Sequence, residues 1–125
     1  MPSQILATLK NIPGRVKNAM RYSLQGLASA FSKEESIRLE TLALILLVAI
    51  LAPIPWPLWK KAALIAAYFL VPLAELFNSA IEDLCDLVSP GYNEKIKNAK
   101  DKGSAAVLLA IIAGCFILIA LILCP

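Results

Sequence analysis

The longest uncharged segment of the chain, residues 103–125, most restricts the fold. A helix that crosses a membrane needs about 20 apolar residues, because the hydrocarbon core is about 30 Å thick. Two further uncharged runs lie at residues 41–59 and 62–74. The 125-residue chain is 59% hydrophobic, so a water-soluble fold would expose large apolar patches. The sequence therefore predicts an all-α membrane protein.

The prolines and charges set the limits of the expected membrane spans. Pro53 ends the first run, so that helix must begin near Glu35 to be long enough. The second run reaches sufficient length only if Glu75 and Asn78 lie inside the span. Pro72 predicts a kink there, because a proline ring removes a helical hydrogen bond. We expect three transmembrane helices in each protomer, at about residues 35–52, 62–82 and 103–124.

The N-terminal region, residues 1–31, differs from the three-span domain expected at residues 32–125. Apolar side chains recur every three or four residues over 5–31, with basic residues between them. This pattern predicts an amphipathic helix in the membrane interface, which Pro13 and Gly14 could interrupt. Ser32 is the expected cap of the helix that follows. No cleavable signal peptide is recognisable, so we expect the N-terminus to be retained.

The basic residues predict the orientation in the membrane. Of the twelve Lys and Arg residues, six lie before the first expected span or in its first turn, two follow this span, and four lie between the second and third. The positive-inside rule then places the N-terminus and the second loop in the cytoplasm and the C-terminus in the periplasm. The net charge of +3 suits anionic lipid headgroups. Because no basic patch is interleaved with stacking aromatics, we expect no nucleic-acid partner.

A stripe of polar residues lies within and beyond the second expected span. Steps of three and four residues put its members on one helix face, and they are Glu75, Asn78, Ser79, Glu82 and Asp86. An ionisable group inside a membrane costs roughly 2.5 kcal/mol or more and usually has a function. An isolated acid could instead make only an interhelical hydrogen bond. The two-turn spacing of Glu75 and Glu82 suits a proton acceptor and a metal ligand.

The types of residue present restrict the chemistry further. The sequence has no histidine and no Walker-type phosphate loop, so an enzyme would use carboxylates, lysine, arginine and a metal. Lys100 and Asp101 precede the third span and are expected to face the acidic stripe. We expect Glu40 to extend toward the headgroups. The remaining lysines of this loop are expected to be solvated, namely Lys95, Lys97 and Lys102.

Two segments carry a resemblance to a known family. Residues 75–82, followed by Asp86 and by residues 99–107, resemble the small integral-membrane diacylglycerol kinases of bacteria, and the resemblance extends from about Arg15 to the end of the third span. It implies a homotrimeric helical bundle of three-span protomers, each with a surface amphipathic helix, in the bacterial inner membrane. It also implies transfer of the γ-phosphate of MgATP to the hydroxyl of diacylglycerol, which gives phosphatidic acid.

The resemblance also implies roles for individual residues. Glu75 matches the catalytic base, with Asn78 beside it, and Glu34 and Glu82 match the ligands of Mg²⁺. The implied nucleotide-binding residues are Arg15, Tyr22, Glu34, Glu82, Asp86, Gly91, Tyr92, Asn93, Lys100 and Asp101. The implied contacts with the lipid substrate are Glu75, Ser104, Ala28, Ser29, Ala30 and Phe31. Asn93 stands where the family often has histidine.

Two other functions remain open from the sequence. The Gram-positive branch of the family prefers undecaprenol as the lipid alcohol, whereas Ser79 and the Gly103–Ser104 pair are more similar to the diacylglycerol branch. A small oligomeric ion or proton conduit would use Glu75 as a relay inside the membrane. A conduit would consume no ATP and would give no role to Lys100 and Asp101.

Overall fold

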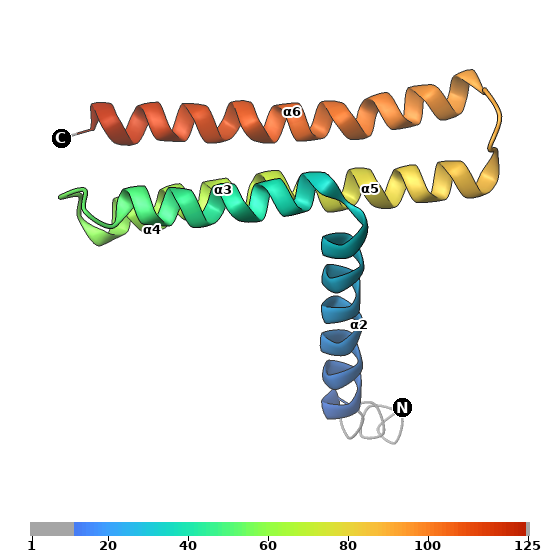
Figure 1. Ribbon diagram of the computed structural model, residues 1–125, viewed down its shortest axis with the longest axis horizontal. Helices are drawn as coiled ribbons and strands as arrows, with labels where there is room; N and C mark the ends of the chain where they lie inside the picture. The colour runs from blue at the N-terminus through green and yellow to red at the C-terminus, as the bar shows by residue number, and fades with distance from the viewer. Residues whose placement is uncertain (1–11, 125) are drawn as a thin grey trace, which may run out of the picture. The chain divides into compact units, whose positions relative to one another are not determined.

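A computed structural model of the protein describes residues 12–124, and its contacts divide the chain into one unit that ends at Lys33 and another that begins at Glu34. The described residues form helices α2 to α6 and contain no strand. The first unit contributes α2 (Ile12–Lys33), which Figure 1 draws as one uninterrupted helix. Pro13 lies in its first turn, where the missing N–H breaks no helical hydrogen bond. The predicted interruption at Pro13 and Gly14 is therefore absent, and residues 5–11 lie outside the described part.

Helix α3 (Glu35–Leu51) begins and ends close to the predicted limits of the first span. The expectation that Ser32 caps this helix is wrong, because Glu34 occupies the N-cap position with an extended backbone. The Ser32 hydroxyl instead donates to the carbonyl oxygen of Ser29, at 2.9 Å. The Glu34 carboxylate makes no capping hydrogen bond, so it can reach toward another helix.

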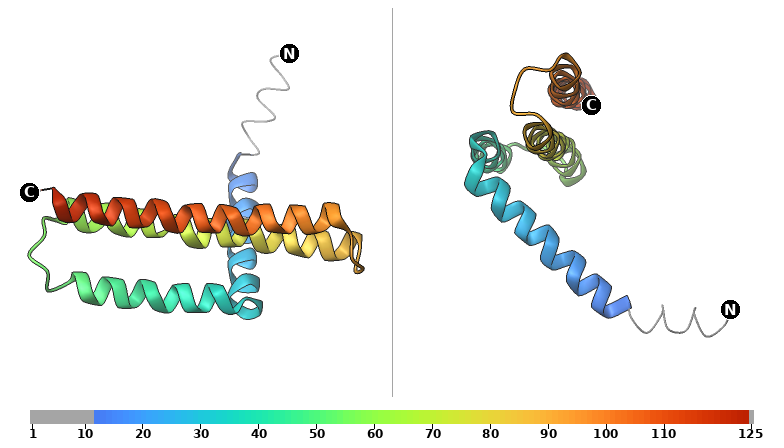
Figure 2. Two further views of the ribbon diagram at one scale, coloured as in Figure 1. Left: turned by 90° about the horizontal axis from the view of Figure 1, so that it is seen from above. Right: turned by 90° about the vertical axis from the view of Figure 1, so that its right-hand side faces the viewer.

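The second predicted span is interrupted near its proline. Helix α4 (Leu58–Tyr68) and helix α5 (Leu70–Val88) meet at Phe69. Pro72 has no N–H to donate to the carbonyl of Tyr68, so the helical ladder is broken where the sequence predicts a kink. The two helices nevertheless follow one another along the same line in Figure 2.

Helix α6 (Glu94–Leu123) starts at a well-formed cap. The Asn93 side-chain oxygen accepts hydrogen bonds from the backbone N–H groups of Lys95 and Ile96, at 2.9 and 3.4 Å. Such a cap satisfies donors that a helix leaves unpaired. The first turns of α6 are charged, and the apolar part starts at Gly103.

Within the second unit, α3, the α4–α5 pair and α6 run side by side (Figures 1 and 2). The α5–α6 connection lies at one end of these helices, and the C-terminal end of α6 lies at the other. Leu51, Leu64 and Leu121 form a small buried cluster at the terminal end. Most apolar side chains of α6 face outward, including Phe116, which is 68% exposed. A bundle with so many outward apolar side chains suits a lipid environment.

Two segments of the described chain are long and apolar enough to cross a membrane, namely Leu58–Val88 and Glu94–Leu123. The protein is thus all-helical with two candidate spans. The first predicted span corresponds to α3, whose 17 residues fall short of the usual length of about 20. The count of three spans stays a prediction.

Candidate functional site

The polar stripe of α5 forms two hydrogen bonds at adjacent residues. Asn78 is buried, and its Nδ2 donates to Oε1 of Glu82 at 3.0 Å. Ser79 Oγ donates to Oε1 of Glu34 at 2.8 Å. The two carboxylates that the resemblance assigns to a metal are therefore held by consecutive residues of one helix turn.

The second wall of this network is α6. Gly103 is buried, and a Cβ at this position would overlap Asn78 Oδ1. Within residues 12–124, that buried oxygen has no hydrogen-bond partner. The absence of a side chain at Gly103 lets α6 approach α5 closely enough to enclose the Asn78 amide.

Glu40 differs from its predicted orientation. Its Oε2 is buried and, among the described residues, unpaired, and its backbone carbonyl accepts a hydrogen bond from the Tyr68 hydroxyl at 2.6 Å. Its carboxylate also interacts electrostatically with Glu75. The expectation that Glu40 extends to the headgroups is wrong, because this face of α3 packs toward the α4–α5 pair. An acid five residues inside a predicted span was a signal for a buried position.

A pocket of about 350 Å³ lies at the α5–α6 connection. It gathers six of the nucleotide-binding residues implied by the resemblance, namely Asp86, Gly91, Tyr92, Asn93, Lys100 and Asp101. This volume is in the range of small-molecule sites. Tyr92 is 86% exposed, whereas the oxygen of Asn93 is occupied by the cap of α6.

Two ion pairs line this pocket. Lys100 Nζ lies 2.6 Å from Oδ1 of Asp86, so Lys100 faces the stripe as predicted. This hydrogen bond from Lys100 to Asp86 raises the pKa of Lys100, which keeps its ammonium charged. Asp101 lines the same pocket as Asp86 and pairs with Lys97 at 2.6 Å. Lys97 is exposed, as predicted, and also forms this ion pair, which the spacing of four residues allowed to be foreseen.

An apolar groove of about 690 Å³ runs along α5 and α6 beside the network. Phe77, Asn78, Gly103 and Ala106 are among its lining residues. The Asn78 side chain thus borders an apolar surface as well as the polar stripe. Ser104 is exposed on α6 and does not line this groove.

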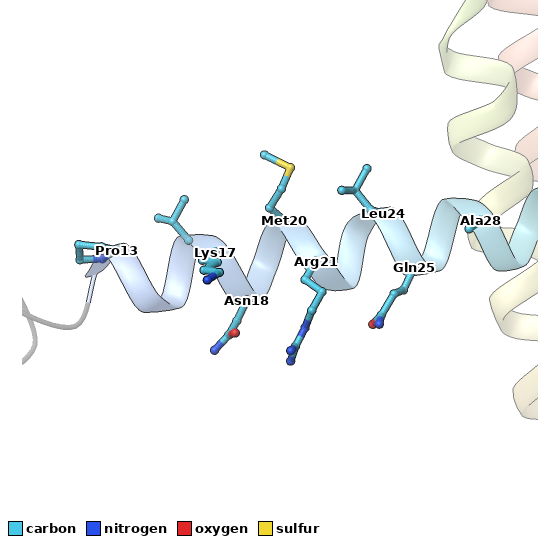
Figure 3. A pocket seen from close by; sticks show the side chains of 9 residues that line it. Pro13, Lys17, Asn18, Met20, Arg21, Leu24, Gln25 and Ala28 are labelled. Atoms are coloured by element: carbon cyan, nitrogen blue, oxygen red, sulfur yellow. The ribbon is translucent and has the colours of Figure 1, made fainter.

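The remaining predicted site residues lie on α2, in the unit that ends at Lys33. Arg15 and Tyr22 are exposed, as are Ser29 and Phe31, while Ala30 is partly covered. An open groove of about 920 Å³ on this helix includes Ala28. Figure 3 shows Met20 and Leu24 on one side of the helix and Arg21 and Gln25 on the other. This arrangement is the amphipathic pattern expected of an interfacial helix.

The residues present suit Mg²⁺ as a partner of the nucleotide. The described chain has no cluster of three or more His, Cys, Asp or Glu side chains able to hold a metal. Glu34 and Glu82 each use one oxygen in the bonds to Ser79 and Asn78, which leaves the second oxygen for a ligand. Mg²⁺ is usually bound by one or two carboxylates together with water and substrate phosphates. Two carboxylates fit that requirement.

Comparison with known proteins identifies the family. Residues 21–123 match the family model described as prokaryotic diacylglycerol kinase. The chain is 40% identical over 98 residues to the diacylglycerol kinase of Escherichia coli K12, covering 78% of this chain and 80% of that protein. It is 41% identical over 101 residues to the Pseudomonas aeruginosa diacylglycerol kinase, covering 78% and 79% respectively. Arg15 lies before the range matched by the family model. The chain therefore belongs to the prokaryotic diacylglycerol kinase family of enzymes.

Proposed function

We propose that the protein transfers the γ-phosphate of MgATP to the hydroxyl of diacylglycerol and releases phosphatidic acid and ADP. The observation that supports this most strongly is the arrangement along α5. Glu75 lies in the apolar part of this helix, and Asp86 lies at its charged end beside Lys100. A lipid alcohol arrives from the bilayer and ATP arrives from water, so one helix offers polar groups to both.

We place the nucleotide in the pocket at the α5–α6 connection, with Lys100 near its phosphates. Phosphoryl transfer depends mainly on positioning and on neutralising phosphate charge. The ammonium of Lys100 supplies one positive charge. Tyr92 offers an exposed ring on which a nucleobase can stack. Arg15 and Tyr22 on α2 are proposed further nucleotide contacts.

Glu34 and Glu82 would hold Mg²⁺ together with the ATP phosphates, and Asn78 and Ser79 orient these carboxylates through their hydrogen bonds. When bound, the metal neutralises charge on the β- and γ-phosphates. Glu34 and Glu82 would supply only part of the metal's ligands, and phosphate and water would supply the rest. Magnesium sites that bind nucleotides usually have this composition.

Glu75 is the proposed base. The hydroxyl oxygen of the lipid forms a bond to the γ-phosphorus, the bond from that phosphorus to the bridging oxygen of ADP breaks, and the hydroxyl proton passes to Glu75. The alcohol loses its proton late in a dissociative transfer, so a carboxylate of ordinary strength within reach is sufficient. Ser104 and residues 28–31 are the proposed lipid contacts. We propose that the enzyme works as a homotrimer of three-span protomers in the bacterial inner membrane, with the site at the cytoplasmic face.

Transfer of labelled γ-phosphate by the purified protein in mixed micelles tests this function. Diacylglycerol and undecaprenol are offered separately, and we expect labelled phosphatidic acid as the dominant product. Glu75→Gln should remove nearly all turnover, because it deletes the base while keeping the size of the side chain. Asp83→Asn is the matched control, since Asp83 lies on α5 outside the stripe and is exposed.

Each other outcome has a defined meaning. Undecaprenyl phosphate as the main product would retain the mechanism and change the acceptor. Product from neither lipid would contradict the kinase proposal and favour the conduit. Near wild-type activity in Glu75→Gln would show that Glu75 is not the base.

A further inference from the structure

The pocket at the α5–α6 connection contains a second ammonium group beside that of Lys100. Lys97 lines the pocket, and its Nζ lies 2.6 Å from Oδ2 of Asp101, one helical turn further along α6. The pocket thus holds two ammonium groups, each paired with one carboxylate. Its charges are balanced when no ligand is bound.

The position of Lys97 does little for the stability of α6. Lys97 lies in the first turn of the helix, where the helix dipole disfavours a positive charge. A lysine that precedes its acidic partner by four residues is also the less favourable order. The side chains of Lys97 and Asp101 are 56% and 59% exposed, and exposed ion pairs contribute little to stability. This ion pair can therefore exchange its partner at small cost.

We propose that Lys97 is a second phosphate-binding residue, whose ammonium leaves Asp101 to bind the polyphosphate of the nucleotide beside Lys100. This inference rests on the proposed kinase function. The backbone N–H groups of Lys95 and Ile96 already donate to Asn93, so the donors left to meet a phosphate are the ammonium groups of Lys97 and Lys100, which line the pocket. Asp101 holds the Lys97 ammonium near the pocket until the phosphates arrive.

The order of residues along α6 assigns Lys97 to a particular part of the nucleotide. Gly103 packs against Asn78, and Lys100 and Lys97 lie progressively further from it along the helix. Three residues of helix span about 4.5 Å, so the two ammonium groups can contact different phosphates of one polyphosphate. Lys100 therefore meets the phosphates nearer the reacting end, and Lys97 meets those nearer the nucleoside. Removing Lys97 should therefore weaken the binding of ATP, ADP and AMP, because all three carry the phosphate nearest the nucleoside.

The test compares Lys97→Gln with Lys95→Gln in the purified full-length protein. Lys95 lies on the same helix but does not line the pocket, so it controls for loss of one surface charge. For Lys97→Gln we expect the KM for MgATP to rise about 3- to 10-fold, in line with one charge-assisted contact. The kcat and the KM for diacylglycerol should stay near wild type, and Lys97→Arg should restore most of the affinity. Calorimetry with a non-hydrolysable ATP analogue, ADP and AMP measures binding without turnover.

An equal rise in KM for Lys95→Gln would reduce the effect to general surface charge and overturn the proposal. An unchanged KM in Lys97→Gln would show that Lys97 is only solvated. A fall in kcat accompanied by reduced thermal stability would indicate a structural role instead. If the wild-type protein binds no nucleotide and transfers no phosphate, the proposed kinase function fails as well, and so the two failures are distinguishable.

Discussion

Replacing Gly103 with alanine should disrupt the polar network, although alanine is normally the better helix residue. A methyl group at this position would overlap Asn78 Oδ1 and lie 3.2 Å from Asn78 Cγ and 3.5 Å from Asn78 Cα. Because that Cα belongs to the backbone of α5, the side-chain amide must rotate away or the two helices must separate. Rotation of the amide breaks the 3.0 Å bond from Asn78 to Glu82, whereas separation of the helices opens the contact that encloses this amide.

Three effects determine the magnitude. Alanine in place of glycine inside a helix gains about 1 kcal/mol. An additional methyl group in a packed contact costs about 1–3 kcal/mol. Loss of the hydrogen bond from Asn78 to Glu82 within α5 costs about 0.5–1.5 kcal/mol. We therefore expect Gly103→Ala to lower the free energy of unfolding by roughly 1–2 kcal/mol. Activity should fall further, because Glu82 loses the Asn78 amide that orients it.

The assay is reversible unfolding in micelles by titration with a denaturing detergent, followed by the fluorescence of Trp56 and Trp59. Gly114→Ala is the control, because Gly114 lies on the same helix with nothing within 4 Å of the added Cβ. This variant should be neutral or more stable by up to about 1 kcal/mol. Combining Gly103→Ala with Asn78→Ala should relieve the overlap and give a coupling energy of about 0.5–3 kcal/mol. Equal stability and activity of the two glycine variants would refute the close approach of α6 to Asn78.

Two further variants test the contacts that reach between helices. Ser79→Ala should raise the Mg²⁺ concentration needed for half-maximal activity several-fold, because Glu34 loses its 2.8 Å hydrogen bond. Ser79→Thr keeps the hydroxyl and should restore the Mg²⁺ requirement of the wild type. A magnesium titration and Mn²⁺ binding measure the effect, and a change confined to lipid affinity would contradict the assignment. Lys60 is buried and donates to the carbonyl groups of Leu121 and Cys124, so Lys60→Met should lower the free energy of unfolding by about 1–3 kcal/mol without altering kcat. Lys61→Met is the control, because the Lys61 ammonium donates to the exposed carbonyl of Ala52 at 3.1 Å. This variant should change the free energy of unfolding by less than about 0.5 kcal/mol. Equal effects of the two variants would contradict a role for burial.

Those parts of the fold that depend on local chain chemistry were predictable from the sequence. Pro72 interrupts the helix at Phe69 because the missing N–H is a property of the proline itself. Pro53 likewise limits α3, which ends at Leu51. The N-cap of α3 was not predictable in the same way, because the Ser32 hydroxyl can either cap the following helix or bond to a carbonyl of its own helix. Its hydroxyl bonds to the Ser29 carbonyl and stays inside α2.

The site shows the same division between local and distant contacts. The bond from Asn78 to Glu82 follows from spacing of four residues on one helix. The bond from Ser79 to Glu34 joins residues 45 apart in sequence, and no pattern within a single helix specifies such a pair. The prediction of the Glu40 orientation was wrong for a related reason. An almost uniformly apolar helix such as α3 contains no periodic signal that fixes which face packs on its neighbours.

The spacing of groups along α5 restricts how the proposed substrates can meet. Asp86 lies eleven residues beyond Glu75, which corresponds to about 16 Å along the helix axis. A phosphate held at Lys100 beside Asp86 is therefore not at the base, and the triphosphate must extend along the stripe toward Glu82 and Asn78. For the γ-phosphate to approach Glu75, the phosphate chain must extend along α5 while the nucleoside stays at the α5–α6 connection. In the proposed reaction, Glu34 and Glu82 would serve between the two ends, because their hydrogen bonds to Ser79 and Asn78 hold them at the level where the most highly charged part of the nucleotide would pass.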